Sequence, residues 1–139
     1  MASDPSRLSI DERLTQFLQS SAARKFEWTK CNCGFWVCEW IKITKGIDPV
    51  AEYRGRFKTT KGFIRFIKSS GGNENFSRKI AHAAGLEQTY TPHIGDVGLI
   101  NCGEAGATMA IKGDSDKWIA KTYSGIATGP WPCIIAWRL

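Results

Sequence analysis

The sequence predicts an α+β domain in which helices come first and strands come last. Up to about residue 85, apolar residues recur at helical spacing between capping residues. After residue 92, short apolar runs alternate with turns rich in Gly and Asp, which is typical of strands. The 139 residues suit one domain, and 42% hydrophobic residues can form a core. We therefore expect a single domain over residues 1–139, with helices packed on one face of a small antiparallel sheet.

The first two predicted helices have distinct boundaries. Ser9 and Glu12 have the spacing of a capping box, and the helix that they open should run to about Ala22. The second helix should begin at Cys33 and end at Lys45, just before a glycine. Because it is apolar nearly all round, we expect it to be the central buried helix.

Further helices and the strands follow in order. Thr60 is the expected cap of a third helix, which two glycines at 71–72 end. Asn75 is the expected cap of a fourth helix, which Gly85 closes. The expected strands cover residues 97–100, 108–111, 118–120 and 133–137.

The net charge of +6 is concentrated in one segment. Between residues 54 and 68 there are six basic residues and no acid: Arg54, Arg56, Lys58, Lys61, Arg65 and Lys68. Such a stripe attracts an anionic partner, for example nucleic acid, teichoic acid or an acidic protein surface, or it is only the solvated face of a helix. No nucleic-acid motif accompanies it, so we do not expect nucleic-acid binding. We also expect no membrane span, because no stretch approaches the ~20 apolar residues that one needs.

A cysteine that opens a buried helix is the strongest candidate for chemistry. The N–H groups and dipole at a helix N-terminus favour a thiolate, so Cys33 is a candidate nucleophile. A thiol nucleophile also needs a base within hydrogen-bond reach. The chain has two histidines, of which His82 should lie on the fourth helix as a structural residue and His93 just before the first strand.

The five cysteines are an odd number in a chain without a signal-peptide layout, so we expect reduced thiols. Cys31, Cys33 and Cys38 have the spacing C-x-C-x4-C, which fits no common zinc pattern. Together with Cys102 or Cys133 they leave an iron–sulfur or zinc site as an alternative. The simpler interpretation is that Cys38, Cys102 and Cys133 are small buried residues, and we predict no cofactor.

Two segments resemble those of NlpC-type papain-like cysteine peptidases, which cut peptide bonds in peptidoglycan. Asn32-Cys33-Gly34-Phe35 is similar to a degenerate form of their Asp-Cys-Ser-Gly-Phe nucleophile motif. Residues 94–99, Ile-Gly-Asp-Val-Gly-Leu, resemble their Gly-Asp-Leu strand start. The resemblance implies a papain-like fold with Cys33 at the nucleophile position.

The chain resembles more closely a small family of phage and prophage tail-region proteins derived from that fold. They share an aromatic residue before the helix cysteine, here Trp28, and a Gly-x-Asp-Pro segment, here residues 46–49. They also share Tyr-Arg-Gly-Arg-Phe, here residues 53–57, and a final Ala-Trp-Arg, here residues 136–138. The likeness begins at about residue 26, which leaves residues 1–25 as an N-terminal helix extension.

The resemblance breaks down at the catalytic base. In the peptidases a His opens the next strand and acts as general base. The aligned segment here begins at Thr108, whose hydroxyl cannot take a proton near neutral pH. His93 lies at the wrong end of the first strand for the family's geometry.

The resemblance therefore implies a non-catalytic structural or assembly component of a phage tail tip or baseplate, built on a peptidase-like fold. Such a virion component is made in the host cytoplasm, and its partners are other tail or baseplate proteins and, as a further contact, peptidoglycan. The alternative is an active peptidase or amidase that cleaves peptidoglycan while DNA enters the host. It would use Cys33 as nucleophile and His93, or else His82, as base. A metal module of the tail hub is the third hypothesis.

Partner contacts should come from arginine and tryptophan, which are favoured interface anchors. The candidates are Arg54, Arg56, Trp118 and Trp131, and we expect at least one of the two tryptophans to be exposed. Alternatively, both rings close over the sheet as core lids. The segment around Gly55 should also be a structural corner in which an arginine binds a carboxylate or a carbonyl. We expect three other tryptophans to be buried: Trp36, Trp40 and Trp137.

Overall fold

The structure, a computed structural model, describes residues 8–22, 24 and 33–139. Its helices are α1 (Ile10–Ala22), α2 (Cys33–Lys45), α3 (Thr60–Ser69) and α4 (Gly72–Ala83). Its strands are β1 (Glu87–Thr89), β2 (Val97–Asn101), β3 (Ala107–Lys112), β4 (Trp118–Thr122), β5 (Gly125–Gly129) and β6 (Cys133–Arg138), with a 3-10 turn at Gly103–Ala105. This order confirms the predicted α+β class. Among the described residues, no helix combines the length and the apolar character that a membrane crossing requires.

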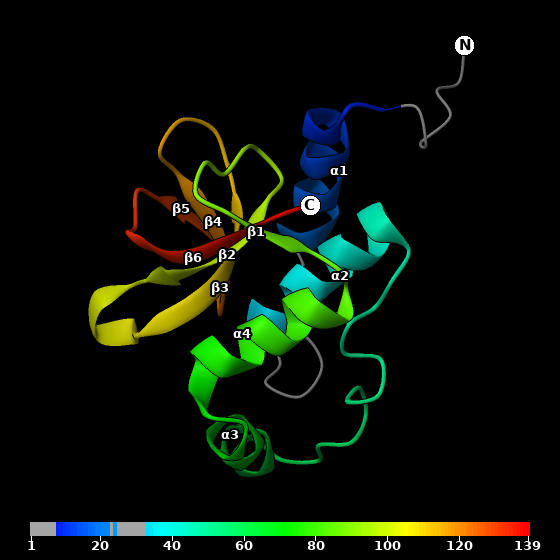
Figure 1. The fold of residues 1–139 in the computed structure, drawn as a ribbon, viewed down its shortest axis with the longest axis vertical. Coiled ribbons are helices and arrows are strands. Elements are labelled where there is room, and N and C mark those ends of the chain that lie inside the picture. The colour runs from blue at the N-terminus through cyan, green and yellow to red at the C-terminus, as the bar shows by residue number, and fades with distance from the viewer. Residues whose placement is uncertain (1–7, 23, 25–32) are drawn as a thin grey trace.

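The strands form one antiparallel sheet in the order β1-β6-β2-β3-β4-β5. Figure 1 shows the sheet on one side of the molecule and the helices on the other. α2 contacts β3 and β4, α4 contacts β2 and β3, and α1 contacts β5. Side chains along a strand alternate between faces, so each strand has an α2 side and a far side.

The main core fills the space between the helices and the α2 side of the sheet. Trp36 and Trp40 are fully buried on α2, as predicted, and Trp137 is buried as well. The Phe17 ring of α1 stacks on Trp36 with 5.4 Å between ring centroids. Trp40 Nε1 donates to the Gly95 carbonyl oxygen at 2.8 Å, which fixes α2 to the chain just before β2. Although α1 lies outside the resemblance, it is part of this core.

A smaller cluster covers the far side of the sheet. Trp118 is its largest member, and its ring lies directly against Gly98, where an added Cβ would come within 2.8 Å of it. Glycine at this position is therefore what allows the ring to lie flat on the sheet. The buried members of the far cluster are Ile100, Ala110, Trp118, Ala120 and Ala136.

Two predicted helix boundaries are confirmed. Ser9 Oγ accepts a hydrogen bond from the Glu12 N–H at 3.2 Å and donates to Glu12 Oε1 at 3.1 Å, so Ser9 caps α1 as predicted, with Glu12 as its partner. Past the end of α4, the N–H of Gly85 bonds to the His82 carbonyl oxygen, and the N–H of Leu86 bonds to a carbonyl oxygen one turn back. These bonds close the helix at the expected glycine.

Two other predicted caps are wrong. The cap of α3 is Thr59 rather than Thr60, because Thr59 is extended and its Oγ1 accepts the Gly62 N–H at 3.0 Å. Asn75 caps nothing, because α4 begins at Gly72 and Asn75 lies in its first turn. Thr59 and Thr60 are adjacent and chemically alike, so the sequence does not decide between them, whereas α4 follows a left-handed glycine, Gly71, and has no side-chain cap.

Candidate functional site

The predicted nucleophile occupies the first position of α2. Cys33 is the first helical residue, and Phe35, Trp36, Val37 and Cys38 after it are fully buried. This confirms the backbone position from which a helix N-terminus favours a thiolate. The Cys33 side chain lies outside the described part of the structure, as do residues 25–32 with Cys31 and Trp28.

His93 lies beside the opposite end of α2. Its side chain is exposed and lines a surface depression of about 340 Å³ together with Thr44 and Lys45. Thr44 is about three turns after Cys33, which is roughly 16 Å along the helix axis. A base must come within hydrogen-bond reach of its thiol, so His93 is not positioned to activate Cys33.

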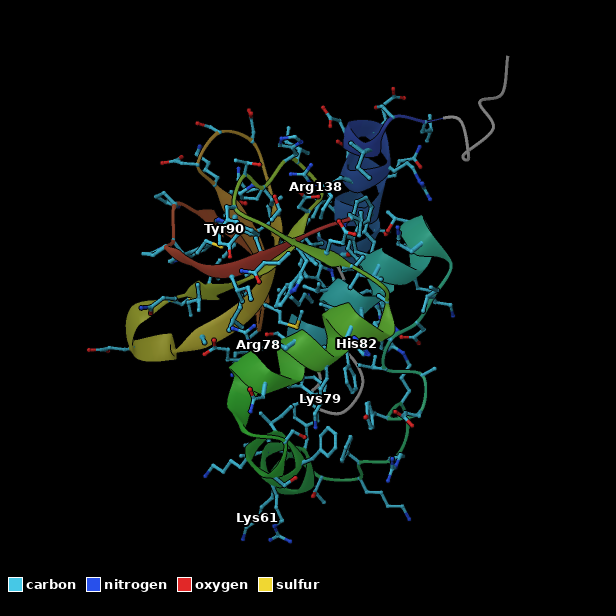
Figure 2. The ribbon with its side chains drawn as sticks, in the orientation of Figure 1. Lys61, Arg78, Lys79, His82, Tyr90 and Arg138 are labelled. Atoms are coloured by element: carbon cyan, nitrogen blue, oxygen red, sulfur yellow. The ribbon has the colours of Figure 1, made fainter. Side chains whose placement is uncertain are left out.

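His82 is the second histidine of the chain, and it lies on α4 (Figure 2). Its side chain is exposed and lines a groove with Pro49 and Glu52 from the segment that follows α2. This position matches the expected helix-surface residue. Neither histidine therefore lies on β3, the strand on which the resemblance puts the base.

The register between β2 and β3 decides which side chains of β3 point toward α2. Thr108 lies directly opposite Ile100, which belongs to the far cluster, and directly opposed residues share a face. Thr108 therefore points away from α2, and the expectation that it stands in the base position is wrong by one residue. The α2-side residues of β3 are Ala107, Met109 and Ile111, and none of these side chains can accept a proton.

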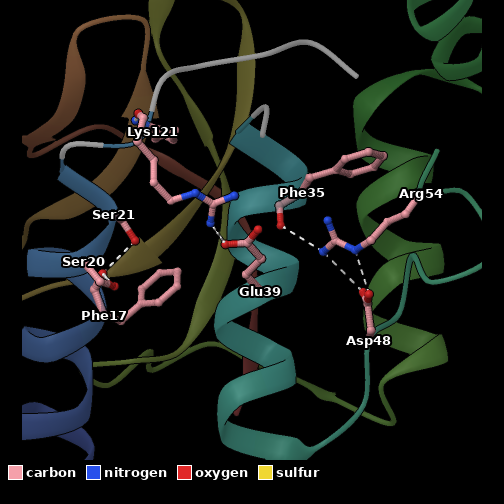
Figure 3. A network of polar contacts seen from close by, with 9 residues as sticks. Phe17, Ser20, Ser21, Phe35, Glu39, Asp48, Arg54 and Lys121 are labelled. Atoms are coloured by element: carbon pink, nitrogen blue, oxygen red, sulfur yellow. Dashed lines mark hydrogen bonds and ion pairs between the residues drawn. The ribbon is translucent and has the colours of Figure 1, made fainter. Parts of the chain in front are cut away.

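A polar network joins Arg24, which follows α1, to α2 and β4 (Figure 3). Lys121 of β4 is 3% exposed, and its Nζ donates to the carbonyl oxygens of Arg24 and Gly125. The Arg24 guanidinium forms an ion pair with Glu39 of α2. The sequence alone gives no signal for the buried Lys121, because strand lysines are usually exposed.

Arg54 anchors the loop that follows α2 (Figure 3). Its Nε donates to Asp48 Oδ2 at 2.7 Å, and its guanidinium carbon lies 5.3 Å from the centroid of the Phe35 ring. The next residue, Gly55, has φ +78°, a left-handed conformation that disfavours side chains. The predicted corner is therefore confirmed. Arg54 makes internal contacts rather than a free partner surface, whereas Arg56 is exposed.

Asp96 is a second carboxylate with an internal arginine partner, and it connects segments that are distant in sequence. It is 3% exposed and accepts hydrogen bonds from the N–H groups of His93 and Leu139, at 2.8 and 2.9 Å, and from Arg138 Nε at 2.9 Å. Arg138 also donates to the Thr91 carbonyl oxygen at 2.8 Å. The Gly-Asp and Ala-Trp-Arg motifs thus form one structural unit. Sequence reasoning noted both motifs but missed their pairing, for which their opposite charges were the available signal.

A model of one protein family, described as a domain of unknown function (DUF6950), matches residues 6–139. The chain belongs to the DUF6950 family. The match includes α1, so the first helix is part of the family's domain. Comparisons with curated proteins and with solved structures found no match.

Of the two tryptophans proposed as partner contacts of this DUF6950 domain, one is buried and the other is half-buried. Trp118 is 3% exposed and Trp131 is half-buried, so the expectation that at least one of the two is exposed is wrong. The strand alternation turns the Trp118 ring onto the far side of the sheet, where it covers Gly98. Trp131 is half-buried and packs against the same cluster, which supports the alternative that both rings act as lids over the sheet.

The cysteines of the DUF6950 domain occupy different environments. Cys38 is buried and Cys102 is half-buried, but Cys133 is exposed, so the expectation that all three are buried is wrong for Cys133. Residues 8–22, 24 and 33–139 contain no group of three or more His, Cys, Asp or Glu side chains that could hold a metal. The alternative metal site at Cys31, Cys33 and Cys38 extends outside these residues and stays a prediction.

Proposed function

We propose that this chain is a non-catalytic structural or assembly component of a phage tail tip or baseplate, built on a fold related to NlpC-type papain-like cysteine peptidases. One observation carries the non-catalytic part: β3 presents Ala107, Met109 and Ile111 toward α2, and none of them can act as a base. Proton transfer by a positioned base contributes roughly 10²–10⁴-fold to such reactions. A thiol at Cys33 without that base lacks its main means of activation.

Three features of the fold support the relation to the peptidases. Cys33 begins the central helix, that helix packs against an antiparallel sheet, and the Gly-Asp start of β2 lies beside β3. The tail-region assignment rests on the sequence motifs, in which Arg54 and Arg138 have internal roles whereas Arg56 is exposed. Arg54, Asp96 and Arg138 hold the fold together. A chain that keeps these fold-stabilising residues without a base is suited to work by contact with other tail or baseplate proteins.

Peptidoglycan hydrolysis separates this proposal from the peptidase alternative. We would incubate the purified protein and its Cys33→Ala variant with purified muropeptides and follow the products by mass spectrometry. We expect neither protein to exceed the blank. A turnover by the wild type that Cys33→Ala abolishes would establish the peptidase alternative instead.

A pair of gain-of-function variants tests the relation to the peptidases. Ala107→His would add an imidazole on the α2 side of β3, whereas Thr108→His, the matched control, would add one on the far side. We expect hydrolysis to appear only in Ala107→His, and to disappear again when Cys33→Ala is added. Equal activity of the two histidine variants would argue against the assigned geometry.

The location of the chain tests the tail assignment. Particles released by a strain that encodes this chain would be purified, and their proteins identified by mass spectrometry and immunogold labelling. We expect the chain in intact particles, with label confined to the tail tip. Its absence from particles that contain the other tail proteins would contradict the proposal.

A further inference from the structure

We propose that the outer side of α3 is a docking surface for an acidic amphipathic helix of a neighbouring protein. This inference deepens the proposed function, on which it rests, by naming the surface and the chemistry of its partner. The surface consists of Lys61, Ile64, Arg65 and Lys68, and it is called the cationic face below. All four side chains are exposed.

The cationic face follows from the helical period of α3. Its members recur at i, i+3, i+4 and i+7, so they lie on one side of the helix. The opposite side carries Phe63, Phe66 and Ile67, which pack against the main core. α3 lies at one end of the molecule, away from the sheet, and Lys61 extends outward from it (Figure 2). A partner helix would therefore reach the face without displacing another helix or strand of the described residues.

The positive charges of the cationic face are not neutralised within the described part of the chain. Lys61, Arg65 and Lys68 form no ion pair there, whereas Arg54 and Arg138 each donate to a carboxylate. The first turn of α3 contains no acid that would offset them. Over about 10 Å of helix, three uncompensated cations form a row that complements carboxylates at the same spacing.

Ile64 indicates which kind of anionic partner fits. It lies between the cations, is 41% exposed, and would gain from an apolar partner side chain. A phosphate backbone offers no such group, whereas an acidic amphipathic helix can present a leucine between glutamates. Nucleic-acid surfaces also use exposed aromatic rings for stacking, but the two aromatics of α3, Phe63 and Phe66, pack against the core. The observations therefore favour a protein helix.

The test measures binding of the full-length protein to a synthetic peptide by fluorescence anisotropy. The peptide has ~16 residues, about four helical turns, with glutamates at helical spacing around a central leucine. We expect the triple variant K61E/R65E/K68E to weaken binding at least about tenfold, because it reverses the charges that face the peptide. Ile64→Ser should weaken it roughly threefold or more through the lost apolar contact. Thermal unfolding would verify that both variants are folded.

The matched control is K42E/K79E/K117E, which makes the same change in net charge at exposed positions outside the cationic face. It should weaken binding less than about threefold, because such long-range charge effects are screened by salt. An equal loss in the control would overturn the inference, since the attraction would then be non-specific. No effect of Ile64→Ser would also overturn it, as would tighter binding of a DNA duplex to the same face.

Particle assembly separates this inference from the proposed function. If wild-type protein enters particles and K61E/R65E/K68E enters them equally, the docking surface is wrong but the tail assignment stands. If the variant alone is excluded, the docking surface is supported. If the wild type is itself absent from particles, the tail assignment fails, and the peptide measurements still decide whether the face binds an acidic helix.

Discussion

Two sets of cations in this domain differ in what surrounds them. Arg54 and Arg138 each donate to a carboxylate, and the side chains of those acids, Asp48 and Asp96, are only 11% and 4% exposed. The cations of α3 extend into solvent without an ion pair in the described residues. Arg138 joins segments 42 positions apart, and Arg54 ties the loop after α2 to Asp48 and to the Phe35 ring of α2, so the first set supports the fold. The second joins nothing within the described chain, which is why we assign it to contact with a partner.

The largest effect is expected at Asp96. Asp96→Ala would remove the shared acceptor of three hydrogen bonds and leave two backbone N–H groups without a partner. We expect a loss of about 2–4 kcal/mol in the free energy of unfolding, at the lower end because Arg138 is partly exposed. Urea unfolding followed by tryptophan fluorescence measures it.

Glu74→Ala is the matched control for Asp96→Ala. It removes a carboxylate from an exposed i,i+4 pair with Arg78 and should cost no more than about 0.5 kcal/mol. If the two variants lose the same stability, burial of the carboxylate does not distinguish the two sets of cations, and the comparison above fails.

The next effect concerns the two arginines that flank Gly55. Arg54→Ala should lower the free energy of unfolding by about 1–2 kcal/mol, because it breaks the bond to Asp48 and the contact with the Phe35 ring. Arg56→Ala removes the same side chain from an exposed position and should cost less than about 0.5 kcal/mol. Chemical unfolding of both variants checks the difference, and an equal cost would mean that the corner does not depend on Arg54.

A substitution at Gly55 tests the backbone conformation of this corner separately from the contacts of its side chains. An added Cβ would meet nothing within 4 Å, so Gly55→Ala acts only through the left-handed φ of +78°. We expect a loss of about 1 kcal/mol. A loss far above that value would indicate that the substitution rearranges the loop and displaces Arg54.

The sequence predicts well what depends on local pattern. The start of α2 at Cys33 and the burial of Trp36 and Trp40 follow from helical periodicity and caps, which involve residues close in sequence. By contrast, β1 and β5 were not expected. β1 has only three residues, and β5 begins and ends with glycine, so neither has a clear local strand pattern. β1 depends on its pairing with β6, which is distant in sequence, and β5 depends on its pairing with β4, which precedes it directly.

The candidate site was less predictable because it depends on strand register and on long-range pairing. A shift of one residue turns a strand side chain to the other face, which is why Ala107 faces α2 and Thr108 does not. Trp118 is buried because the far side of the sheet has an apolar cluster of its own, which no local pattern indicates. Asp96 and Arg138 are 42 positions apart, and no local pattern connects them. The fold class was therefore predictable, whereas the identity of the α2-side residues on β3 required the sheet itself.

The smallest effect, and of opposite sign, is expected on α3. Lys61 and Arg65 are like charges at i,i+4, Arg65 and Lys68 are like charges at i,i+3, and Lys61 lies in the first turn, where the helix dipole disfavours a cation. K61Q/R65Q/K68Q should therefore raise the free energy of unfolding by about 0.5–1 kcal/mol at low salt. The gain should disappear near ~1 M salt, where the screening length is only about 3 Å. Urea unfolding at the two salt concentrations measures it. A loss of more than about 1 kcal/mol would show that these cations stabilise the fold and would contradict the comparison. A salt-dependent gain in the free energy of unfolding would show that the cations cost stability, as expected of charges that serve contact with a partner.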